Sequence, residues 1–375
     1  MKQYMHQQDV SSLASGAMYL GSGGGGDTTF MQFMAEEAIR EYGPVPLLSP
    51  FALSGEKWVV PVAIFGSPVI LSEKLISGNE LIGALHQLEQ VKQVTASAVT
   101  AVGIGGMNAL SPILTAALAK LPVVDCDGMG RTFTELQMTT FHAFGVQASP
   151  FIMQNDRGHR YQIKRASNFE VEQVGRQKVT EMGGWAATAC YPMTAQVLRE
   201  VAVHRSISLA VRLGERVRAA GADIHQVFAA LVHVLHNSLY GRPCKLMEGK
   251  VVNLQRNLTA GLLIGSLIIE GGGFDTGEQA EVFFKNEYLS VKRGKQTLAT
   301  VPDLICILDA STGRSMAIEE LEQNMQVWVI SIPCPYMVRH PNMLEVVGPE
   351  AYGLEGTYVS TQERCLLEQG GQERV

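Results

Sequence analysis

The stretch "AVTAVGIGGMNALSPILTAALAKLPVVDCDGMG" (residues 98–130) contains the alternation that decides the fold. An apolar run ending in glycines comes first, a segment with apolar residues at helical spacing follows, and a second apolar run ends in acidic residues. A strand, a helix and a strand in this order predict a parallel or mixed sheet with helices on its faces. Ligands of such sheets collect at the carboxyl ends of the strands, where the glycines and the acids lie.

The flanking segments extend this pattern. "KWVVPVAIFGSP" (57–68) predicts a buried strand, and "TTFMQFMAEEAIREYG" (28–43) and "ELIGALHQLEQV" (80–91) predict helices. "NDRGHRYQIKRA" (155–166) predicts a short hairpin. We therefore expect an N-terminal α/β domain over residues 1–165.

The middle of the chain has a helical pattern. "TAQVLREVAVHRSISLAVRLGERVRAAG" (194–221) predicts one long helix that stops at Gly221. "DIHQVFAALVHVLHNSLYG" (223–241) predicts a second helix. We expect residues 166–240 to form a helical segment that packs on the α/β domain.

The last third of the chain changes to short apolar runs separated by Gly and Asp. These runs begin at Lys250, and "MLEVVGP" (343–349) is the last of them. Their spacing predicts a small barrel or sandwich over residues 241–375. The expected fold class is α/β, with a parallel or mixed sheet in the N-terminal domain and a β-rich, barrel-like C-terminal domain.

Composition limits the classes of function. A chain of 375 residues with 46% apolar and 18% charged residues is typical of a globular protein of two domains. A net charge of -6 argues against nucleic acid as the main partner. The N-terminus lacks an apolar signal core, and no stretch supplies the roughly 18 apolar residues of a membrane helix. We therefore expect a cytoplasmic location and no membrane partner, and the apolar β-rich half favours a homo-oligomer.

A second stretch, "YLGSGGGGDTTF" (19–30), places four consecutive glycines before a predicted helix with Thr28 or Asp27 as its N-cap. Glycine permits positive φ and close approach of a backbone. The stretch satisfies GxGxxG, but the preceding "SSLASGAMYL" is at least as typical of a helix as of a strand, and no Walker A lysine follows. Three interpretations stay open: a nucleotide site, a site for another anion or an amide-like small molecule, and a tight helix–strand crossing. Asp27 would repel a phosphate.

The densest group of polar residues is "VVDCDGMGRTFTELQM" (123–138). On an extended strand end Asp125 and Asp127 share one face, and Cys126 points to the other. Two carboxylates on one face can bind a divalent cation or divide into an acid and a base. Arg131 can offer a bidentate fork to a carboxylate, and Glu135 follows on the next turn or helix. The alternative is structural, with an Asx turn at Asp127 and an ion pair of Arg131 with one of the acids.

Histidines and cysteines supply weaker candidates. His225, His233 and His236 lie in one predicted helix, and the i, i+3 spacing of the last two can hold a metal, although a core or surface role is the commoner one. Cys126 and Cys190 have no adjacent histidine to activate a thiol, so a buried apolar role is favoured. The six cysteines form no CxxC pair, which predicts reduced thiols.

Two aspartates of the β-rich region have different settings. Asp309 precedes Gly313 in a sequence typical of a turn. Asp303 follows a proline and precedes an apolar strand, so it could face a cleft.

Six motifs occur in order along about residues 10–355: "LGSGGGGDT", "VVDCDGMGRTFTELQM", "EGKVVNLQR", "NEYLSV", "VPDLICILDASTG" and "EVVGPEAYG". Together they resemble the DUF917 family, which is associated with S-methyl thiohydantoin desulfurase and often accompanies hydantoinase or oxoprolinase proteins. The family commonly has "GGGGDP" and "GRAFPE". This chain has Thr28 in the first motif, and Thr132 and Thr134 in the second, but it keeps the acids and Arg131.

The resemblance implies hydrolysis of a small cyclic ureide or an S-methyl thiohydantoin. Water would attack an sp² ring carbon at a site formed by the glycine-rich loop and the "DCDGMGR" strand end. The alternative is a non-catalytic metabolite-binding subunit, or a partner of a hydantoinase- or oxoprolinase-type enzyme.

The residues that we expect to act fall into three groups. The catalytic candidates are Asp125, Asp127 and Glu135. The substrate-binding candidates are Gly23, Gly24, Gly25, Gly26, Asp27, Gly130, Arg131 and Glu287. A divalent metal is a candidate cofactor, with Asp125, Asp127, His233 and His236 as its candidate ligands.

Overall fold

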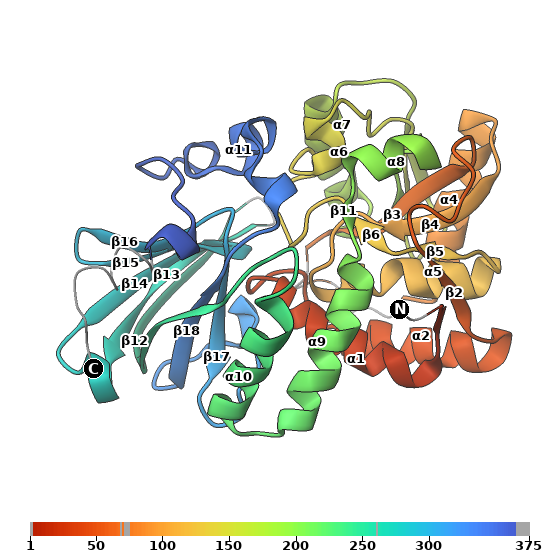
Figure 1. Ribbon diagram of the computed structural model, residues 1–375. Helices are drawn as coiled ribbons and strands as arrows, with labels where there is room; N and C mark the ends of the chain where they lie inside the picture. Colours follow the sequence, from red (N-terminus) through yellow and green to blue (C-terminus); the bar gives the residue numbers. More distant parts are fainter. Residues whose placement is uncertain (1–2, 68–69, 71–75, 260–261, 365–375) are drawn as a thin grey trace. The chain divides into compact units, whose positions relative to one another are not determined.

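The computed structural model describes residues 3–67, 70, 76–259 and 262–364 (Figure 1). The chain forms two compact units. Unit 1 consists of Met1–Leu20 and Gly25–Gly214, and unit 2 consists of Gly21–Gly24 and Glu215–Val375. The predicted helical segment 166–240 is therefore divided between the units, and so is the glycine-rich loop.

Unit 1 is built on a mixed sheet, as predicted. The strands follow the order β1 (Tyr4–Met5), β2 (Val45–Leu48), β5 (Val123–Val124), β4 (Ala96–Ala101), β3 (Trp58–Gly66), β9 (Trp185–Ala189), β7 (Phe151–Gln154) and β8 (Arg160–Ile163), and β10 (Met193–Thr194) also pairs with β3. Strands β2, β5, β4 and β3 are parallel, and β9, β7 and β8 continue the sheet in antiparallel pairing. Strands β7 and β8 form a hairpin, and the predicted range 155–166 contains its turn and β8 but not β7.

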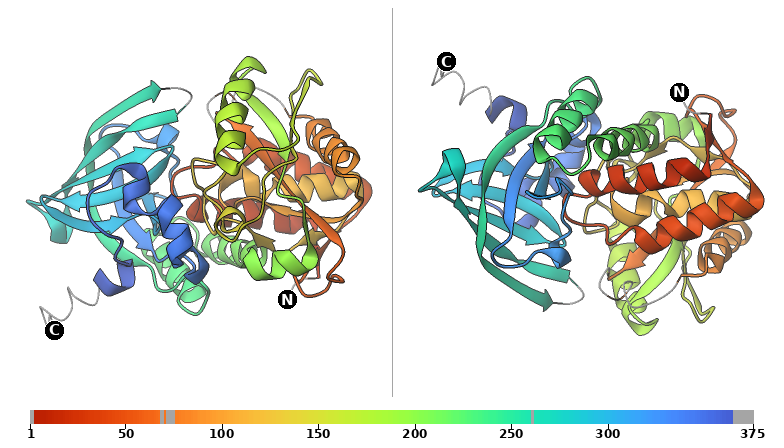
Figure 2. Two further views of the ribbon diagram at one scale, coloured as in Figure 1. Left: turned by 90° about the horizontal axis from the view of Figure 1, so that it is seen from above. Right: turned by 90° about the horizontal axis from the view of Figure 1, so that it is seen from below.

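Helices cover both faces of this sheet, which explains the continuous apolar sequence of β3. Helices α4 (Asn79–Lys92) and α5 (Ser111–Ala119) follow β3 and β4, and α1 (Gln7–Leu20) and α2 (Thr29–Tyr42) pack beside α5 and the short helix η1 (Gly106–Ala109) (Figure 2). Helix α7 (Asn168–Glu181) lies on the opposite face from α4. Gly83 of α4 contacts Gln154 of β7, whereas Gly175 of α7 contacts Phe151 of the same strand, and these two strand residues point to opposite faces.

The prediction of one long helix over 194–221 is wrong. The structure has α8 (Ala195–Val201), the short strand β11 (Val203–His204) and α9 (Ser206–Ala220), which ends before Gly221 as predicted. The predicted strand over 122–130 is likewise interrupted, because β6 (Cys126–Asp127) leaves the large sheet and pairs with β11. Val203 pairs with Asp127, which lies far away in the sequence. This strand pairing replaces the helical hydrogen bonds that the local apolar spacing predicts for residues 194–221.

Unit 2 begins with the end of α9 and with α10 (Ile224–Leu235). Asp223 caps α10, since its carboxylate accepts from the His225 N–H at 2.8 Å. An antiparallel sheet follows, in the order β16 (Gln296–Thr300), β15 (Glu287–Arg293), β14 (Gln279–Lys285), β13 (Leu262–Gly271), β12 (Cys244–Thr259), β18 (Gln326–Ile332) and β17 (Leu304–Asp309). The sheet curls into a half-barrel around its own apolar core, which confirms the β-rich, barrel-like region (Figure 1).

The prediction of a strand at 343–349 is wrong, because residues Pro341–Val347 form helix α11. Pro341 occupies the first helical position, where its missing N–H costs nothing. His340 Nδ1 accepts from the Asn342 N–H at 3.2 Å and caps the helix. Two short helices, η4 (Tyr336–Arg339) and η5 (Pro349–Tyr352), flank α11.

Candidate functional site

The first half of the glycine-rich loop is fixed within unit 2. The Tyr288 N–H donates to the Ser22 carbonyl at 2.8 Å, and the Ile318 N–H donates to the Gly23 carbonyl at 3.1 Å. A Cβ atom on Gly23 would lie 2.3 Å from the Tyr288 ring, and one on Gly24 would lie 2.6 Å from Cγ of the buried Glu287. These glycines are required by packing on β15. A role of Gly23, Gly24 and Glu287 in substrate binding stays a prediction.

The second half of the loop is fixed within unit 1. A Cβ atom on Gly25 would lie 2.8 Å from the Gly105 carbonyl oxygen, and the Met107 N–H donates to the Gly25 carbonyl at 3.0 Å. Gly26 has φ +71°, which favours glycine. Because a helix, α1, precedes the loop, the strand–turn–helix setting of a dinucleotide fingerprint is absent at this point of the described chain.

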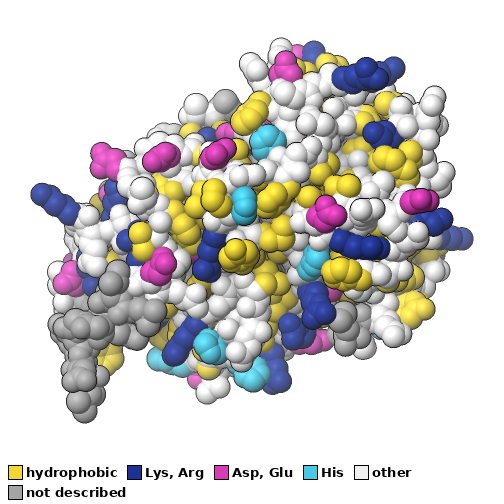
Figure 3. Space-filling view, turned by 45° about the horizontal axis from the view of Figure 1, so that its top comes forward, with side chains coloured by type: hydrophobic (Ala, Val, Ile, Leu, Met, Phe, Trp, Pro, Cys, Tyr) yellow, Lys and Arg dark blue, Asp and Glu magenta, His cyan; other side chains and the backbone are white. Residues whose placement is uncertain are grey.

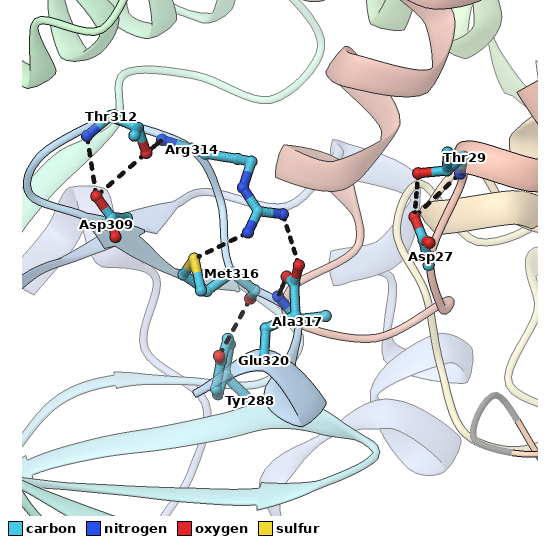
Figure 4. Close-up of polar contacts among 9 residues, drawn as sticks. All are labelled: Asp27, Thr29, Tyr288, Asp309, Thr312, Arg314, Met316, Ala317 and Glu320. Atoms are coloured by element: carbon cyan, nitrogen blue, oxygen red, sulfur yellow. Dashed lines mark hydrogen bonds and ion pairs between the residues drawn. The ribbon is translucent and has the colours of Figure 1, made fainter. Parts of the chain in front are cut away.

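Asp27 serves the start of α2. Its Oδ1 accepts from the Thr29 N–H at 3.0 Å and from the Thr29 hydroxyl at 2.7 Å (Figure 4). The same view shows how unit 2 holds Tyr288, whose hydroxyl donates to the Met316 carbonyl at 3.2 Å. Of the two residues predicted as the N-cap, Thr28 occupies that position without a side-chain hydrogen bond, and the Asp27 carboxylate one residue earlier bonds the first N–H of the helix.

Asp125 lies between β5 and β6 and contacts the start of α9. Its carboxylate Oδ1 accepts from the Ser208 N–H at 2.9 Å, and its carbonyl accepts from the Arg205 N–H at 2.8 Å. A carboxylate is favourable near the positive end of a helix dipole. Burial nevertheless raises the pKa of Asp125, and the hydrogen bonds from Ser208 oppose that rise. In this setting Asp125 stabilises the break between α8 and α9.

Asp127 has a different environment. The residue is completely buried, and its Oδ2 accepts from the Met129 N–H at 2.8 Å and the Gly130 N–H at 2.7 Å. Its Oδ1 has no hydrogen-bond partner among the described residues. Asp127 thus forms the Asx turn that the structural alternative predicted, yet it keeps one carboxylate oxygen unused.

The electrostatics of Asp127 follow from this burial. Burial raises the pKa of Asp127 to about 6, although the N–H groups of Met129, Gly130 and Ile104 and the Ser206 hydroxyl all lower it. Ser206 Oγ is also buried and, like Asp127 Oδ1, makes no regular hydrogen bond within the described chain. A carboxylate with this pKa is mostly ionised at pH 7 and is a stronger base than an ordinary aspartate.

Arg131 and Gly130 lie beside this carboxylate in sequence and serve the same turn. Gly130 has φ +66°. The completely buried Arg131 donates from Nε to the Thr132 carbonyl at 3.0 Å, and its guanidinium lies 4.9 Å from the centroid of the Phe133 ring. A buried guanidinium on an aromatic face is held in one orientation.

Glu135 lies on a turn and accepts from Gln137 Nε2 at 2.5 Å. The next residue is held by an acid that the sequence analysis missed, since Glu172 Oε2 accepts from the Leu136 N–H at 2.9 Å. Glu172 also forms an ion pair of 2.6 Å with Arg176. No local motif marks Glu172, because its partner lies 36 residues earlier in the chain.

The metal candidates do not assemble. His233 is exposed on α10 and His236 is exposed at the C-cap of that helix. Among residues 3–67, 70, 76–259 and 262–364 no group of three or more His, Cys, Asp or Glu side chains could hold a metal ion. The donor set therefore does not fit a resident metal. Burial raises the pKa of the Cys126 and Cys190 thiols far above their ordinary value, in agreement with an apolar role.

The two aspartates of the β-rich region are structural. Asp309 Oδ1 accepts from the Ser311 N–H at 2.8 Å and the Thr312 N–H at 2.9 Å, which confirms the predicted turn (Figure 4). The expectation that Asp303 faces a cleft is wrong. Asp303 is completely buried and accepts from the Cys334 N–H at 2.8 Å, the Tyr358 hydroxyl at 2.7 Å and the Thr361 N–H at 2.6 Å.

The distribution of surface charge in Figure 3 does not mark a binding site. Basic and acidic side chains are interspersed on the face in Figure 3. An open groove of about 550 Å³ lies between the start of α1 and the end of α2, but its charged side chains, such as Arg40, are at the surface. Within the described part of the chain, no helix is both long and apolar enough to span a membrane.

Comparisons with known proteins place the chain in a family. The model for the S-Me-THD-like N-terminal domain matches residues 8–165, and the model for the S-Me-THD-like C-terminal domain matches residues 166–361. A crystal structure of a protein from Chromobacterium violaceum is similar in fold, with a TM-score of 0.79 and 22% identity over 96% of this chain and 99% of that one. No curated protein matches. Because the two family models span nearly the whole sequence, the chain belongs to the S-methyl thiohydantoin desulfurase-like (DUF917) family.

Proposed function

We propose that the protein is a hydrolase acting on a small cyclic ureide or an S-methyl thiohydantoin, in which Asp127 activates the attacking water. One observation carries the mechanism: a completely buried carboxylate has two N–H donors on one oxygen and no hydrogen bond of regular geometry on the other within the described chain. Leaving a buried polar atom unused costs about 1–3 kcal/mol, so such an atom is a strong candidate for a functional contact. The substrate class comes from the family.

The reaction balances with water as the only co-reactant. Asp127 Oδ1 accepts a proton from water as the water oxygen bonds to the ring carbon that carries the S-methyl group. The carbon–sulfur bond of the resulting tetrahedral intermediate then breaks. Methanethiolate leaves and takes the proton from Asp127, which returns to its carboxylate form. The products are the hydantoin and methanethiol.

Neighbouring groups supply the remaining roles in this proposal. N–H groups of the Gly25–Gly26 segment and Arg131 would stabilise negative charge that develops on the ring. Arg131 would also anchor a carboxylate substituent of the substrate. Asp125 would act through α9 as a positioning residue, and Glu135 through the turn that follows Arg131. No step uses a metal, because the donor set does not fit one.

The experiment compares Asp127→Asn with Asp309→Asn, a control in an exposed turn of unit 2. Methanethiol and hydantoin are measured from S-methyl thiohydantoin, with and without a chelator. We expect Asp127→Asn to lose about 10²–10⁴-fold in kcat, the range of a general base, and the control to keep full activity. Full turnover by Asp127→Asn in an active preparation would refute the assignment. Chelator-sensitive turnover would contradict the metal-free mechanism.

A further inference from the structure

Ser206 sits at the break that interrupts the predicted long helix. Residues 203–204 pair with β6, with Val203 opposite Asp127. Arg205 then turns the chain with φ +61°, a value uncommon for a residue with a side chain, and Ser206 begins α9. Backbone strain of this kind persists where the surrounding structure enforces it, and functional sites are frequent examples.

The turn is tied to the acidic strand end at both sides of Ser206. The Arg205 N–H donates to the Asp125 carbonyl at 2.8 Å, and the Ser208 N–H donates to the Asp125 carboxylate at 2.9 Å. Ser206 is thereby held against residues 125–127 by the contacts of its neighbours. Its own hydroxyl makes no hydrogen bond of regular geometry with a described residue, yet it lies close enough to the Asp127 carboxylate to lower the pKa of that group.

Two buried polar atoms in this region, one of Ser206 and one of Asp127, lack a regular hydrogen bond within the described chain. Ser206 Oγ and Asp127 Oδ1 belong to residues with no exposed surface, and neither atom makes a hydrogen bond of regular geometry within the described chain. Buried polar atoms are nearly always satisfied by protein or by water, and a buried water has on average about three polar partners. A carboxylate oxygen and a hydroxyl are complementary partners for one water, since the first only accepts and the second both accepts and donates.

We propose that Ser206 is a second catalytic residue of this site, and that Ser206 Oγ and Asp127 Oδ1 together hold the attacking water. This inference rests on the proposed function. Water donates one hydrogen to Asp127 Oδ1 and the other to Ser206 Oγ, which directs a lone pair of the water oxygen toward the substrate carbon. Only the proton on the Asp127 side is transferred. Ser206 forms no covalent bond.

The test compares Ser206→Ala with Thr115→Val, since both remove a completely buried hydroxyl from a helix of unit 1. The Thr115 hydroxyl of α5 donates to the Ser111 carbonyl at 2.7 Å and has no role in the proposed reaction, so it is a control for the loss of a buried hydroxyl. Cooperative thermal unfolding checks that each variant folds, and Ser206→Gly gives a second removal of the hydroxyl.

We expect Ser206→Ala to lower kcat about 10²-fold with KM within about threefold of the wild type, and Thr115→Val to change neither. The acid limb of kcat/KM should move to higher pH in Ser206→Ala, because a donor that favours the ionised carboxylate is lost. A hydroxyl that only lowers the pKa of Asp127 would move this limb but leave kcat above the limb unchanged.

The outcomes separate the two proposals. Loss of turnover in Asp127→Asn, with kcat and the acid limb unchanged in Ser206→Ala, would overturn the role of Ser206 and leave the proposed function standing. A substrate-derived adduct on Ser206, detected by mass spectrometry after rapid quenching, would also overturn it in favour of a nucleophile. Wild-type protein without turnover would overturn both.

Discussion

Each unit contains a completely buried aspartate, and the two differ in what surrounds the carboxylate. Asp303 of unit 2 receives hydrogen bonds on both oxygens, from Cys334, Tyr358 and Thr361. Asp127 of unit 1 receives them on one oxygen only. Burial alone therefore does not identify a functional acid. The hydrogen bonds left unmade distinguish a carboxylate that stabilises the fold from one with capacity to react.

The largest effect on stability is expected for Asp303→Asn. An asparagine offers one acceptor oxygen, so its amide group would face at least one of the three donors. The amide NH2 would then face another hydrogen-bond donor, and neither donor would have an acceptor in the interior. This should lower the free energy of unfolding by roughly 4 kcal/mol. Denaturant titration at pH 7 measures the change. Wild-type stability in this variant would mean that the three donors find other partners, and the comparison would fail.

The same substitution at Asp127 should act in the opposite direction. Asparagine keeps an acceptor for the Met129 and Gly130 N–H groups and removes the cost of a buried charge. With a pKa of about 6 in the folded state against 3.8 ordinarily, ionisation of Asp127 opposes folding by up to about 3 kcal/mol at pH 7. Asp127→Asn should be more stable than wild type by up to that amount.

The pH dependence of stability is an independent test of whether ionisation of Asp127 opposes folding. Below about pH 4 the carboxyl is protonated in both folded and unfolded chains, so the wild type keeps its full stability. Between about pH 4 and 6 the unfolded chain loses the proton first, so wild-type stability falls as pH rises. The difference between Asp127→Asn and wild type should therefore be small at pH 4 and largest above pH 6. A difference that does not vary with pH would show that Asp127 has an ordinary pKa.

The smallest change in the free energy of unfolding is expected for substitutions in the turn that positions Ser206. Arg205→Gly should raise the free energy of unfolding by about 1 kcal/mol, because glycine adopts φ +61° without strain. Arg205→Lys retains the charge and the strain and serves as the control. Equal stability of the two variants would show that relief of the backbone strain at residue 205 does not stabilise this turn.

Local patterns predicted much of the fold. Helix α2, strand β3 and the β7–β8 hairpin follow from apolar spacing and from glycine or proline at their ends. These elements depend on neighbours in sequence, which a single chain displays directly. The α/β class and the β-rich C-terminal region were predictable for the same reason.

The candidate site was only partly predictable. Asp127 is conspicuous in the sequence, but Ser206 lies inside a segment with a helical pattern from 194 to 221. Pairing of β11 with β6 breaks that helix, and the Asp125 carboxylate accepts from an N–H in the first turn of α9. Both contacts join residues about 80 positions apart. A serine, which favours helix N-termini, was the one local sign of a start at Ser206.

The division of the glycine-rich loop between the units has a consequence for synthesis on the ribosome. Ser22 Oγ donates to the Ile305 carbonyl, a residue that lies 283 positions later in the chain. At about 5–20 residues per second, roughly 15–60 seconds pass between the synthesis of these two residues. During that interval Gly21–Gly24 emerge long before the strands that hold them. The nascent chain must therefore begin to fold with this loop unanchored, and the loop becomes fixed only after strand β17 has emerged.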